Sequence, residues 1–307
     1  MKYEYYAELA GQKSCPTTCT LPEGLAAGFV DGCTVWSTRG DDAKHEARRC
    51  YIQRVKGSTF TLPAELHLEI DFEKCALPSQ CLALEVKFEL LTPWYSKDDR
   101  VFHVLDNPVR KDRVFGVPFM AAASWKGMLR WACRMQAGLR EHLRSVKPFE
   151  EWNDPPWILH LFGNEKGETE HERLHGGALV FYPTWFDRIG FEVINPHSRV
   201  RRAGTQPIYY EVVPPGAKGT LRLLYAPLPG AGQRDGVSPS EAIEKLLEAI
   251  EQLLTAYGIS AKRTVGWGTA KIKEWKVYRK DGQLIQKTNR SELWADLQRW
   301  LAEEVRP

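Results

Sequence analysis

The 307-residue sequence has no run of eighteen apolar residues and no strong excess of charge of either sign. Without such a run no segment can cross a membrane as a helix, so we expect no membrane partner. Residues 1–13 lack the apolar stretch of a secretory signal, which favours a cytoplasmic location. Because the net charge is only +3, any binding of nucleic acid has to depend on local clusters of basic residues.

Motifs of the common enzyme classes are also missing. The sequence contains no dinucleotide-binding, phosphate-loop, nucleophile-elbow or metalloprotease motif, which disfavours an unrelated metabolic enzyme. No internal repeat is convincing. Tryptophan, in contrast, is abundant, with eleven residues, and indicates either large packed surfaces or stacking surfaces.

Cysteine is nearly absent beyond residue 81, since six of the seven cysteines lie within residues 1–81. In a cytoplasmic chain we expect reduced thiols or metal ligands rather than disulfides. Cys15, Cys19, Cys33 and Cys50 could bind a structural zinc ion, although their spacing is not that of a common zinc finger or ribbon. The alternative is small buried thiols. Because residues 1–80 show weak periodicity, we interpret them as an N-terminal extension or small cysteine-containing subdomain.

Regular patterns begin at residue 81. Residues 82–91 alternate as a strand with one buried face. Ser124 is a candidate cap of a helix that runs to about Arg144, on which Lys126, Arg130 and Arg134 recur at four-residue spacing.

The rest of the chain continues the alternation of strands and helices. The clearest helix spans residues 239–257, with Ser238 and Glu241 as a capping box and Gly258 at its end. Further strands are expected at 177–182, 191–194, 219–225 and 269–278, and a last helix at 291–305. The order strand, helix, strands, helix, strand predicts an α+β core over residues 81–280 with helices on one face, followed by a helical tail at 281–307.

Three stretches resemble the RAMP superfamily of RNA-binding proteins, which implies a ferredoxin-like, RRM-like core. The first is DNPVRKD at 106–112 followed by GVPFMAAASWKGMLR at 116–130, similar to the family's PYIPGSSLKGALR. The second comprises LFG at 161–163, GALVFY at 177–182 and VINPH at 193–197, similar to a terminal subunit of Cmr-type complexes. The third is GISAKRTVGWG at 258–268, similar to the family's GAKTSVGYG.

The resemblance implies an RNA-binding subunit of a type III CRISPR effector complex, Cmr- or Csm-like, in antiviral defence. Its partners would be guide crRNA, target RNA and other Cas subunits. A helix start, glycines and cations suit phosphate contacts. The resulting RNA-binding candidates are Ser124, Lys126, Arg130, Arg134, Lys262, Arg263, Gly266 and Gly268. The alternatives are a solvated helix face for the first segment and a plain turn for the second.

A polar, basic segment at about 195–215 corresponds to the family's projecting hairpin, the thumb, which inserts between guide and target nucleotides. It adds His197, Arg199, Arg201 and Arg202 as candidates for contact with RNA or a neighbouring subunit. The alternative is a solvated loop.

Asp106 lies at the position of the aspartate that supports metal-dependent target cleavage in backbone subunits of the family. A carboxylate there could bind Mg²⁺ or orient the attacking ribose 2′-hydroxyl, with Arg110 and Lys111 near the phosphate and His103 as a proton carrier. The alternative is that Asp106 only starts the Asn107–Pro108 turn.

The resemblance has two conflicting implications. The Asp106 loop implies a nuclease, whereas the similarity to a terminal subunit implies a protein without nuclease activity, because terminal subunits are usually not nucleases. A non-catalytic capping subunit therefore stays open beside a target-RNA endoribonuclease. A stand-alone enzyme that processes guide RNA would use an N-terminal histidine as its base. His45 and His67 lie outside the recognisable core, which disfavours that reading.

Overall fold

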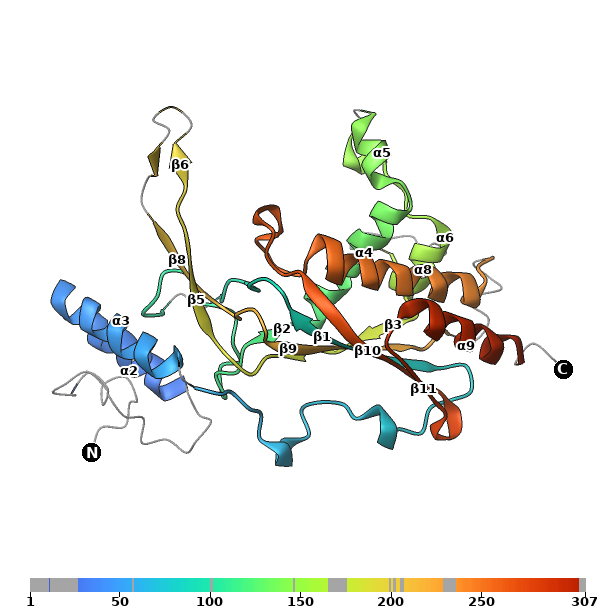
Figure 1. Cartoon of the computed structure of the whole chain (residues 1–307), viewed down its shortest axis with the longest axis horizontal. Helices are drawn as coiled ribbons and strands as arrows, with labels where there is room; N and C mark the ends of the chain where they lie inside the picture. The colour runs from blue at the N-terminus through green and yellow to red at the C-terminus, as the bar shows by residue number, and fades with distance from the viewer. Residues whose placement is uncertain are drawn as a thin grey trace.

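The computed structural model describes residues 11, 27–56, 58–99, 102–145, 147–164, 176–198, 200, 203–204, 207–228 and 236–303. Figure 1 shows a central sheet with helices above it, a ribbon that projects from one end, and N-terminal helices beside that ribbon. No helix of this described part is long and apolar enough to cross a membrane.

The centre of the fold is an antiparallel sheet with strand order β11-β10-β1-β9-β3. The strands are β1 (Leu82–Leu90), β3 (Leu179–Phe181), β9 (Lys218–Tyr225), β10 (Ala270–Tyr278) and β11 (Leu284–Lys287). Helix α4 (Ala122–Gln136) connects β1 to β3, and α8 (Pro239–Gln252) connects β9 to β10. The mixture of helices with one antiparallel sheet confirms the predicted α+β class, and the β-α-β-β-α-β connectivity is compatible with a ferredoxin-like core.

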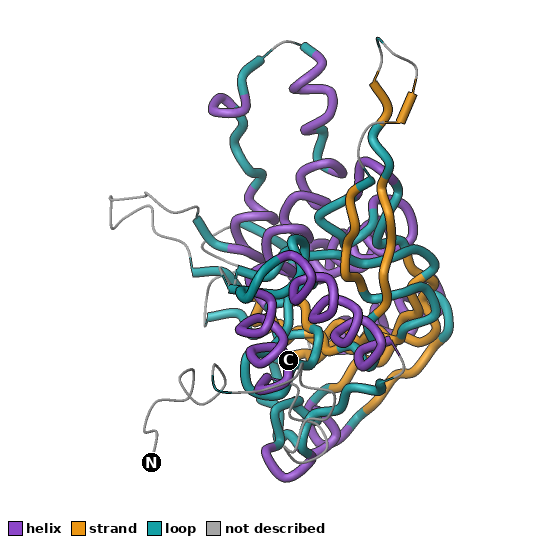
Figure 2. The backbone as a smooth tube through the Cα atoms, turned by 90° about the vertical axis from the view of Figure 1, so that its left-hand side faces the viewer, coloured by secondary structure: helices purple, strands orange, loops and turns teal. Residues whose placement is uncertain are grey.

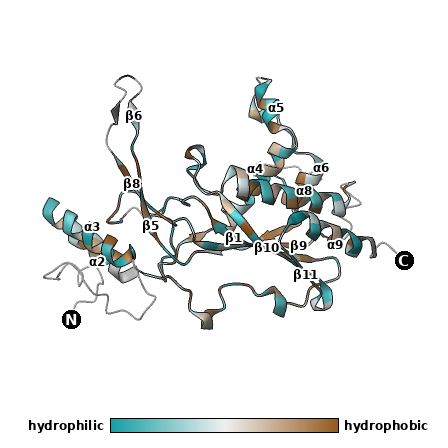
Figure 3. Ribbon diagram, viewed as in Figure 1, coloured by the Kyte–Doolittle hydropathy of each residue, from teal (hydrophilic) through white to brown (hydrophobic). Residues whose placement is uncertain are grey.

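One face of the sheet is buried under helices. Residues 82–86 of β1 are buried on both faces, so the prediction of a single buried face holds only for the second half of the strand. Leu84, Val86 and Phe88 are at most 5 % exposed and belong to the main hydrophobic core. That core also includes the apolar sides of α4, α8 and α9 (Arg290–Glu303). Figure 3 shows apolar and polar residues interleaved along α8 and α9, as expected for helices with one buried side.

The opposite face is crossed by residues 58–81, which run beneath the sheet (Figure 1). Phe72 of this segment packs against Tyr278 of β10, with ring centroids 6.1 Å apart. Arg222 of β9 donates to Glu69 of the segment at 2.6 Å and to Glu85 of β1 at 3.0 Å. The segment therefore covers part of the sheet face that the helices leave open.

The projecting ribbon is the predicted thumb-like hairpin. Its base is β5 (Gly190–Ile194) paired with β8 (Ile208–Val212), and β6 (His197–Ser198) pairs with β7 (Ala203–Gly204) farther out. Figure 2 shows this ribbon extending away from the body of the protein. Two short strands, β2 (Phe119–Met120) and β4 (Thr184–Trp185), pair with each other near the start of α4.

The structure corrects several details of the helices. α4 begins at Ala122, so Ser124 lies inside its first turn and does not cap it. Gly138, with φ of 103°, separates α4 from α5 (Leu139–Arg144), because only glycine adopts this conformation without strain. At α8 the Ser238 side chain makes no cap bond and Glu241 binds Lys245 at 2.5 Å, so the predicted capping box is wrong.

Other elements were not predicted. The described part of residues 1–80 includes the α-helices α2 (Ala27–Ser37) and α3 (Asp41–Lys56), and α6 (Pro156–Phe162) precedes β3. The C-terminal tail contributes strand β11 in addition to the expected helix. Residues 253–257 continue α8 as a π-helical turn that Gly258 ends with φ of 78°.

A buried polar network connects α3, the 103–111 loop and the base of the thumb. The hydroxyl of Tyr51 donates to Glu211 Oε1 at 2.5 Å, and the Nζ of Lys111 donates to the Tyr51 oxygen at 3.0 Å and to Glu211. The backbone amide of Val109 also donates to Glu211, at 2.9 Å. All of these groups are within the protein interior, so each lost contact leaves a buried polar atom unpaired.

Tyr51→Phe should therefore lower the free energy of unfolding by about 1–3 kcal/mol, because Glu211 and Lys111 each lose a buried partner. The matched control is Tyr209→Phe, whose ring is 68 % exposed, with an expected change within about 0.5 kcal/mol. Urea unfolding followed by circular dichroism measures both. Equal values for the two variants would contradict the role of the network.

Candidate nucleic-acid interface

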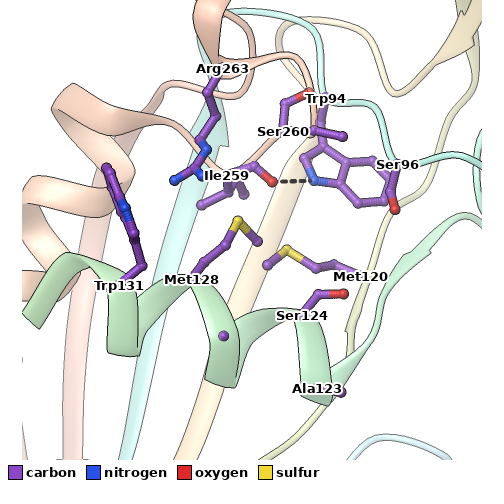
Figure 4. Close-up of a pocket in the computed structure, with 12 residues that line it drawn as sticks. Trp94, Ser96, Met120, Ala123, Ser124, Met128, Trp131, Ile259, Ser260 and Arg263 are labelled. Carbon is purple, nitrogen blue, oxygen red and sulfur yellow. Dashed lines mark hydrogen bonds between the residues drawn. The ribbon is translucent and has the colours of Figure 1, made fainter. Parts of the chain in front are cut away.

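The first and third of the RAMP-like stretches face each other across one pocket. The start of α4 supplies Ser124 and Gly127, and the loop after α8 supplies Ser260, Ala261 and Arg263. The pocket has a volume of about 410 Å³ and is completed by Trp94, Ser96, Met120, Ala123, Met128, Trp131 and Ile259 (Figure 4). The structure thus brings together two segments that are more than 130 residues apart in the chain.

The floor of the pocket is buried and its rim is exposed. Trp94, Met120 and Ile259 are each 1 % exposed, whereas Gly127 and Ala261 lie at the surface. The Trp94 indole donates to the Ile259 carbonyl at 2.9 Å, which joins the loop after β1 to the loop after α8. The pocket is therefore held by contacts that do not require a ligand.

Two predicted glycines play different roles in the loop. Gly268 has φ of 92°, and an added Cβ would lie 2.3 Å from the Ser260 backbone nitrogen. Gly266 has φ of 82°, but an added Cβ would meet nothing within 4 Å. Gly268 is thus required for close packing of the loop on itself, while Gly266 is exposed and open to a ligand.

The loop cations lie against aromatic rings. The Lys262 Nζ lies 5.1 Å from the centroid of the Tyr210 ring, at the base of the thumb. The guanidinium of Arg263 lies 4.4 Å from the centroid of Trp131 on α4. Burial lowers the pKa of Arg263 from its ordinary value, and its buried Nη1 makes no hydrogen bond with any described residue.

Arg130 and Arg134 do not belong to this surface. Both guanidinium groups bind the carboxylate of Asp154: Arg130 Nε donates at 2.8 Å and Arg134 Nε at 2.5 Å. Burial opposes ionisation of Asp154, but hydrogen bonds from Arg134, Trp152 and Arg130 outweigh it and hold the pKa of Asp154 below its ordinary value. Since Arg130 is 9 % exposed, we leave both arginines out of the RNA contacts, and Lys126 stays as the exposed cation of the predicted row.

The thumb candidates lie mostly outside the described residues. This applies to Arg199, Arg201 and Arg202 and to the side chain of His197, whose backbone pairs with Gly204. The described base of the thumb presents Tyr209 and Val193, a cross-strand pair that is 68 % and 50 % exposed, respectively.

Asp106 is exposed and paired with an N-terminal residue. Arg48 of α3 donates from Nη2 to both oxygens of the Asp106 carboxylate at 2.9 Å, and from Nε to the Val104 carbonyl at 3.1 Å. The Asp106 side chain is still 76 % exposed. An exposed pair of this kind contributes at most about 1 kcal/mol, so a competing cation could replace Arg48.

The next residue connects Asp106 to the thumb. The Asn107 side-chain amide donates to the Tyr209 carbonyl at 3.1 Å, and the Glu211 amide donates to the Asn107 carbonyl at 3.0 Å. Asp106 therefore lies where the N-terminal helices, the loop and the thumb meet. Sequence reasoning missed Arg48, because a residue 58 positions away in a segment of weak periodicity gives no local signal.

A pocket of about 520 Å³ lies beside Asp106 and is also lined by Lys97, Asp98, Asp99, His103, Leu105 and Pro108. The Nδ1 of His103 accepts the amide of Leu105 at 3.0 Å. Lys111 is buried against Glu211, and Arg110 lies 3.7 Å from Asp99, so among the described basic residues Arg48 is the one that pairs with Asp106.

The described residues contain no group of three or more His, Cys, Asp or Glu side chains that could hold a metal ion. A Mg²⁺ ion would find in Asp106 one carboxylate ligand and would need RNA phosphate oxygens and water for the others, a common arrangement for this ion.

The predicted zinc site falls partly outside the described residues, since Cys15 and Cys19 are not among them. Cys33 is fully buried in the hydrophobic core, and Cys50 packs against it.

Comparison with known proteins agrees with the motifs. The family model described as the RAMP superfamily matches residues 87–271, more than half of the chain. The chain belongs to the RAMP superfamily. This match includes the start of α4, the Asp106 loop, the thumb and the loop after α8.

Among solved structures, this RAMP protein is similar to a chain of the type III-B Cmr-beta complex bound to cognate target RNA. That likeness has 15 % identity and a TM-score of 0.46, covering 79 % of this chain and 78 % of the other. It is also similar to a chain of the Csm3–Csm4 subcomplex of the type III-A CRISPR-Cas interference complex. The identity is 19 % and the TM-score 0.42, covering 73 % and 98 % of the two chains. No curated protein sequence matches the chain.

Gly268→Ala should destabilise this RAMP protein by about 3 kcal/mol or more, because the positive φ and the contact with Ser260 both oppose a side chain. Gly266→Ala has only the cost of the positive φ and no steric contact, so it should lower the free energy of unfolding by roughly 1–2 kcal/mol. Thermal and urea unfolding of the two variants check the difference, and a Gly268 variant as stable as the Gly266 variant would contradict it.

Proposed function

We propose that the chain is an RNA-binding subunit of a type III CRISPR effector complex and holds guide crRNA in the groove between α4 and the loop after α8. The observation that carries the proposal is the convergence of 124–127 and 260–263 on one pocket. Family membership supports RNA as the ligand, and the motif at 193–197 favours a type III complex.

The groove offers three kinds of phosphate contact. The first turn of α4 has backbone amides that no helical carbonyl accepts, and these favour an anion at the helix start. Gly127 is exposed and leaves space for a close approach of the RNA chain. Lys126 of α4 is exposed and Lys262 of the loop is half-buried, and they add positive charge next to the pocket residues Gly127 and Ala261. In this proposal the protein acts in the cytoplasm with other Cas subunits as partners.

Lys126→Ala should weaken binding of a fluorescein-labelled single-stranded RNA by about three- to tenfold and lower the slope of log affinity against log salt by about one. Fluorescence anisotropy at several salt concentrations measures both quantities with the full chain. Lys74→Ala is the control. The Lys74 side chain is 84 % exposed, and the substitution removes the same charge from residues 58–81, which run beneath the sheet (Figure 1). If both variants bind as the unmodified protein does, the groove is not the RNA site.

A second candidate function, cleavage of target RNA, is favoured by the exposure of Asp106 beside a pocket at the base of the thumb. In such a reaction the ribose 2′-oxygen attacks the adjacent phosphorus and the bond to the 5′-oxygen breaks. The products are a 2′,3′-cyclic phosphate and a 5′-hydroxyl; the 2′-hydroxyl loses its proton to a base, and the leaving oxygen gains one from water. Asp106 would orient the 2′-hydroxyl, and Mg²⁺, when bound, would supply charge compensation at the phosphate.

The non-catalytic capping subunit is the competing proposal, and Asp106→Asn separates the two. In the purified complex, cleavage of a complementary RNA should fall on the order of 10²-fold while binding persists. The control is Asp187→Asn, which also removes a partly exposed carboxylate paired with an arginine, but away from the pocket. Unchanged cleavage by the Asp106 variant would leave the capping role as the function.

A further inference from the structure

The pocket between α4 and the loop after α8 has an apolar floor, which binding of phosphate groups alone does not require. Its floor consists of Trp94 and Met120, each 1 % exposed, and Met128 lies beside them (Figure 4). The Trp94 indole nitrogen is already bonded to the Ile259 carbonyl at 2.9 Å, so the ring offers apolar surface. Aromatic and thioether surfaces suit a flat, polarizable ligand rather than an ion.

One wall carries a donor that lacks an acceptor. The Arg263 guanidinium is held 4.4 Å from the Trp131 ring centroid, and Trp131 is in turn packed edge-on against Tyr257 at 5.0 Å. The buried Nη1 of Arg263 has no hydrogen-bond partner among the described residues. A buried donor without a partner is costly, so a ligand that brings an acceptor to this position is favoured.

The mouth of the pocket is wide enough for such a ligand. Gly127 and Ala261 form exposed parts of its rim, and a Cβ added to Gly127 meets nothing within 4 Å. The volume of about 410 Å³ lies within the range of small-molecule sites, about 300–1,000 Å³. The hydroxyls of Ser96 and Ser124 add polar groups on the walls.

We propose that this pocket binds one nucleobase of the RNA, turned out of the strand, with Arg263 donating to acceptor atoms on the base edge. The proposal rests on the proposed RNA-binding function and specifies what this part of the groove recognises. Single-stranded RNA is commonly read through bases turned out onto aromatic and arginine surfaces. Guanine presents two neighbouring acceptors, O6 and N7, that match a guanidinium, so guanine is the preferred base.

The test uses the full chain and three uridine decamers labelled with fluorescein. One has a central guanosine, one has a central abasic site, and one is uridine throughout. We expect the guanosine decamer to bind on the order of tenfold more tightly than the abasic decamer, because base stacking and the arginine contact are both lost without a base. The all-uridine decamer should lie between them.

Gly127→Leu fills the pocket from its rim, so the guanosine decamer should lose its advantage over the abasic decamer, whatever the overall affinity of the variant. Ala295→Leu is the control: it places a leucine at an exposed position of α9, outside the pocket, and should keep the difference. Arg263→Gln should reduce the preference for guanosine over uridine. Circular dichroism and thermal unfolding verify that each variant is folded.

The outcomes separate the two proposals. If the unmodified protein binds all three decamers equally and Gly127→Leu changes nothing, the base pocket is wrong while the RNA-binding function stands. If the unmodified protein binds none of them, both fail. A guanosine preference that survives Gly127→Leu would place base recognition elsewhere and overturn this assignment.

Discussion

The buried carboxylate of Glu211 is the constraint on which the arrangement of the candidate site depends. It is 1 % exposed and accepts hydrogen bonds from Tyr51, Lys111 and the Val109 amide. An isolated carboxylate in the interior would be very costly, so α3, the 103–111 loop and strand β8 must stay together to satisfy it. The N-terminal helices are therefore packed into the base of the thumb through α3 and do not form a separate subdomain.

The position of Arg48 follows from this network. Arg48 precedes Tyr51 by three residues, almost one turn of α3. The hydrogen bond between Tyr51 and Glu211 therefore also positions Arg48 beside the 103–111 loop. There Arg48 holds the Asp106 carboxylate by a single nitrogen at 2.9 Å from each oxygen. The pair is exposed and weak, in contrast to the buried network beside it, so the Asp106 carboxylate can exchange Arg48 for another cation at low cost.

Local sequence patterns were enough to predict the core, but not the partner that each charged side chain contacts. The alternation of residues 82–91 and the apolar stripe of 239–257 depend on near neighbours, and both elements are present as β1 and α8. The motifs at 116–130 and 258–268 were singled out separately, and the fold brings them to two sides of one pocket. The partners of Arg130, Arg134 and Asp106 lie 20 to 58 residues away. The spacing of residues on a helix cannot show that Arg130 and Arg134 both bind Asp154, or that Arg48 of α3 pairs with Asp106.

The groove is consequently less basic than its sequence indicates. With Arg130 and Arg134 paired with Asp154, the cations at the groove or next to it in the described part of the chain are Lys126, Lys262 and Arg263, and the last two lie over aromatic rings. A surface with so few solvated charges cannot derive most of its affinity from counterion release. In the proposed RNA complex, the buried tryptophan and methionine at the pocket floor would supply the alternative, contact with the faces of bases and sugars. The small net charge of +3 and the eleven tryptophans fit that proposal, in which shape and stacking contribute more than charge.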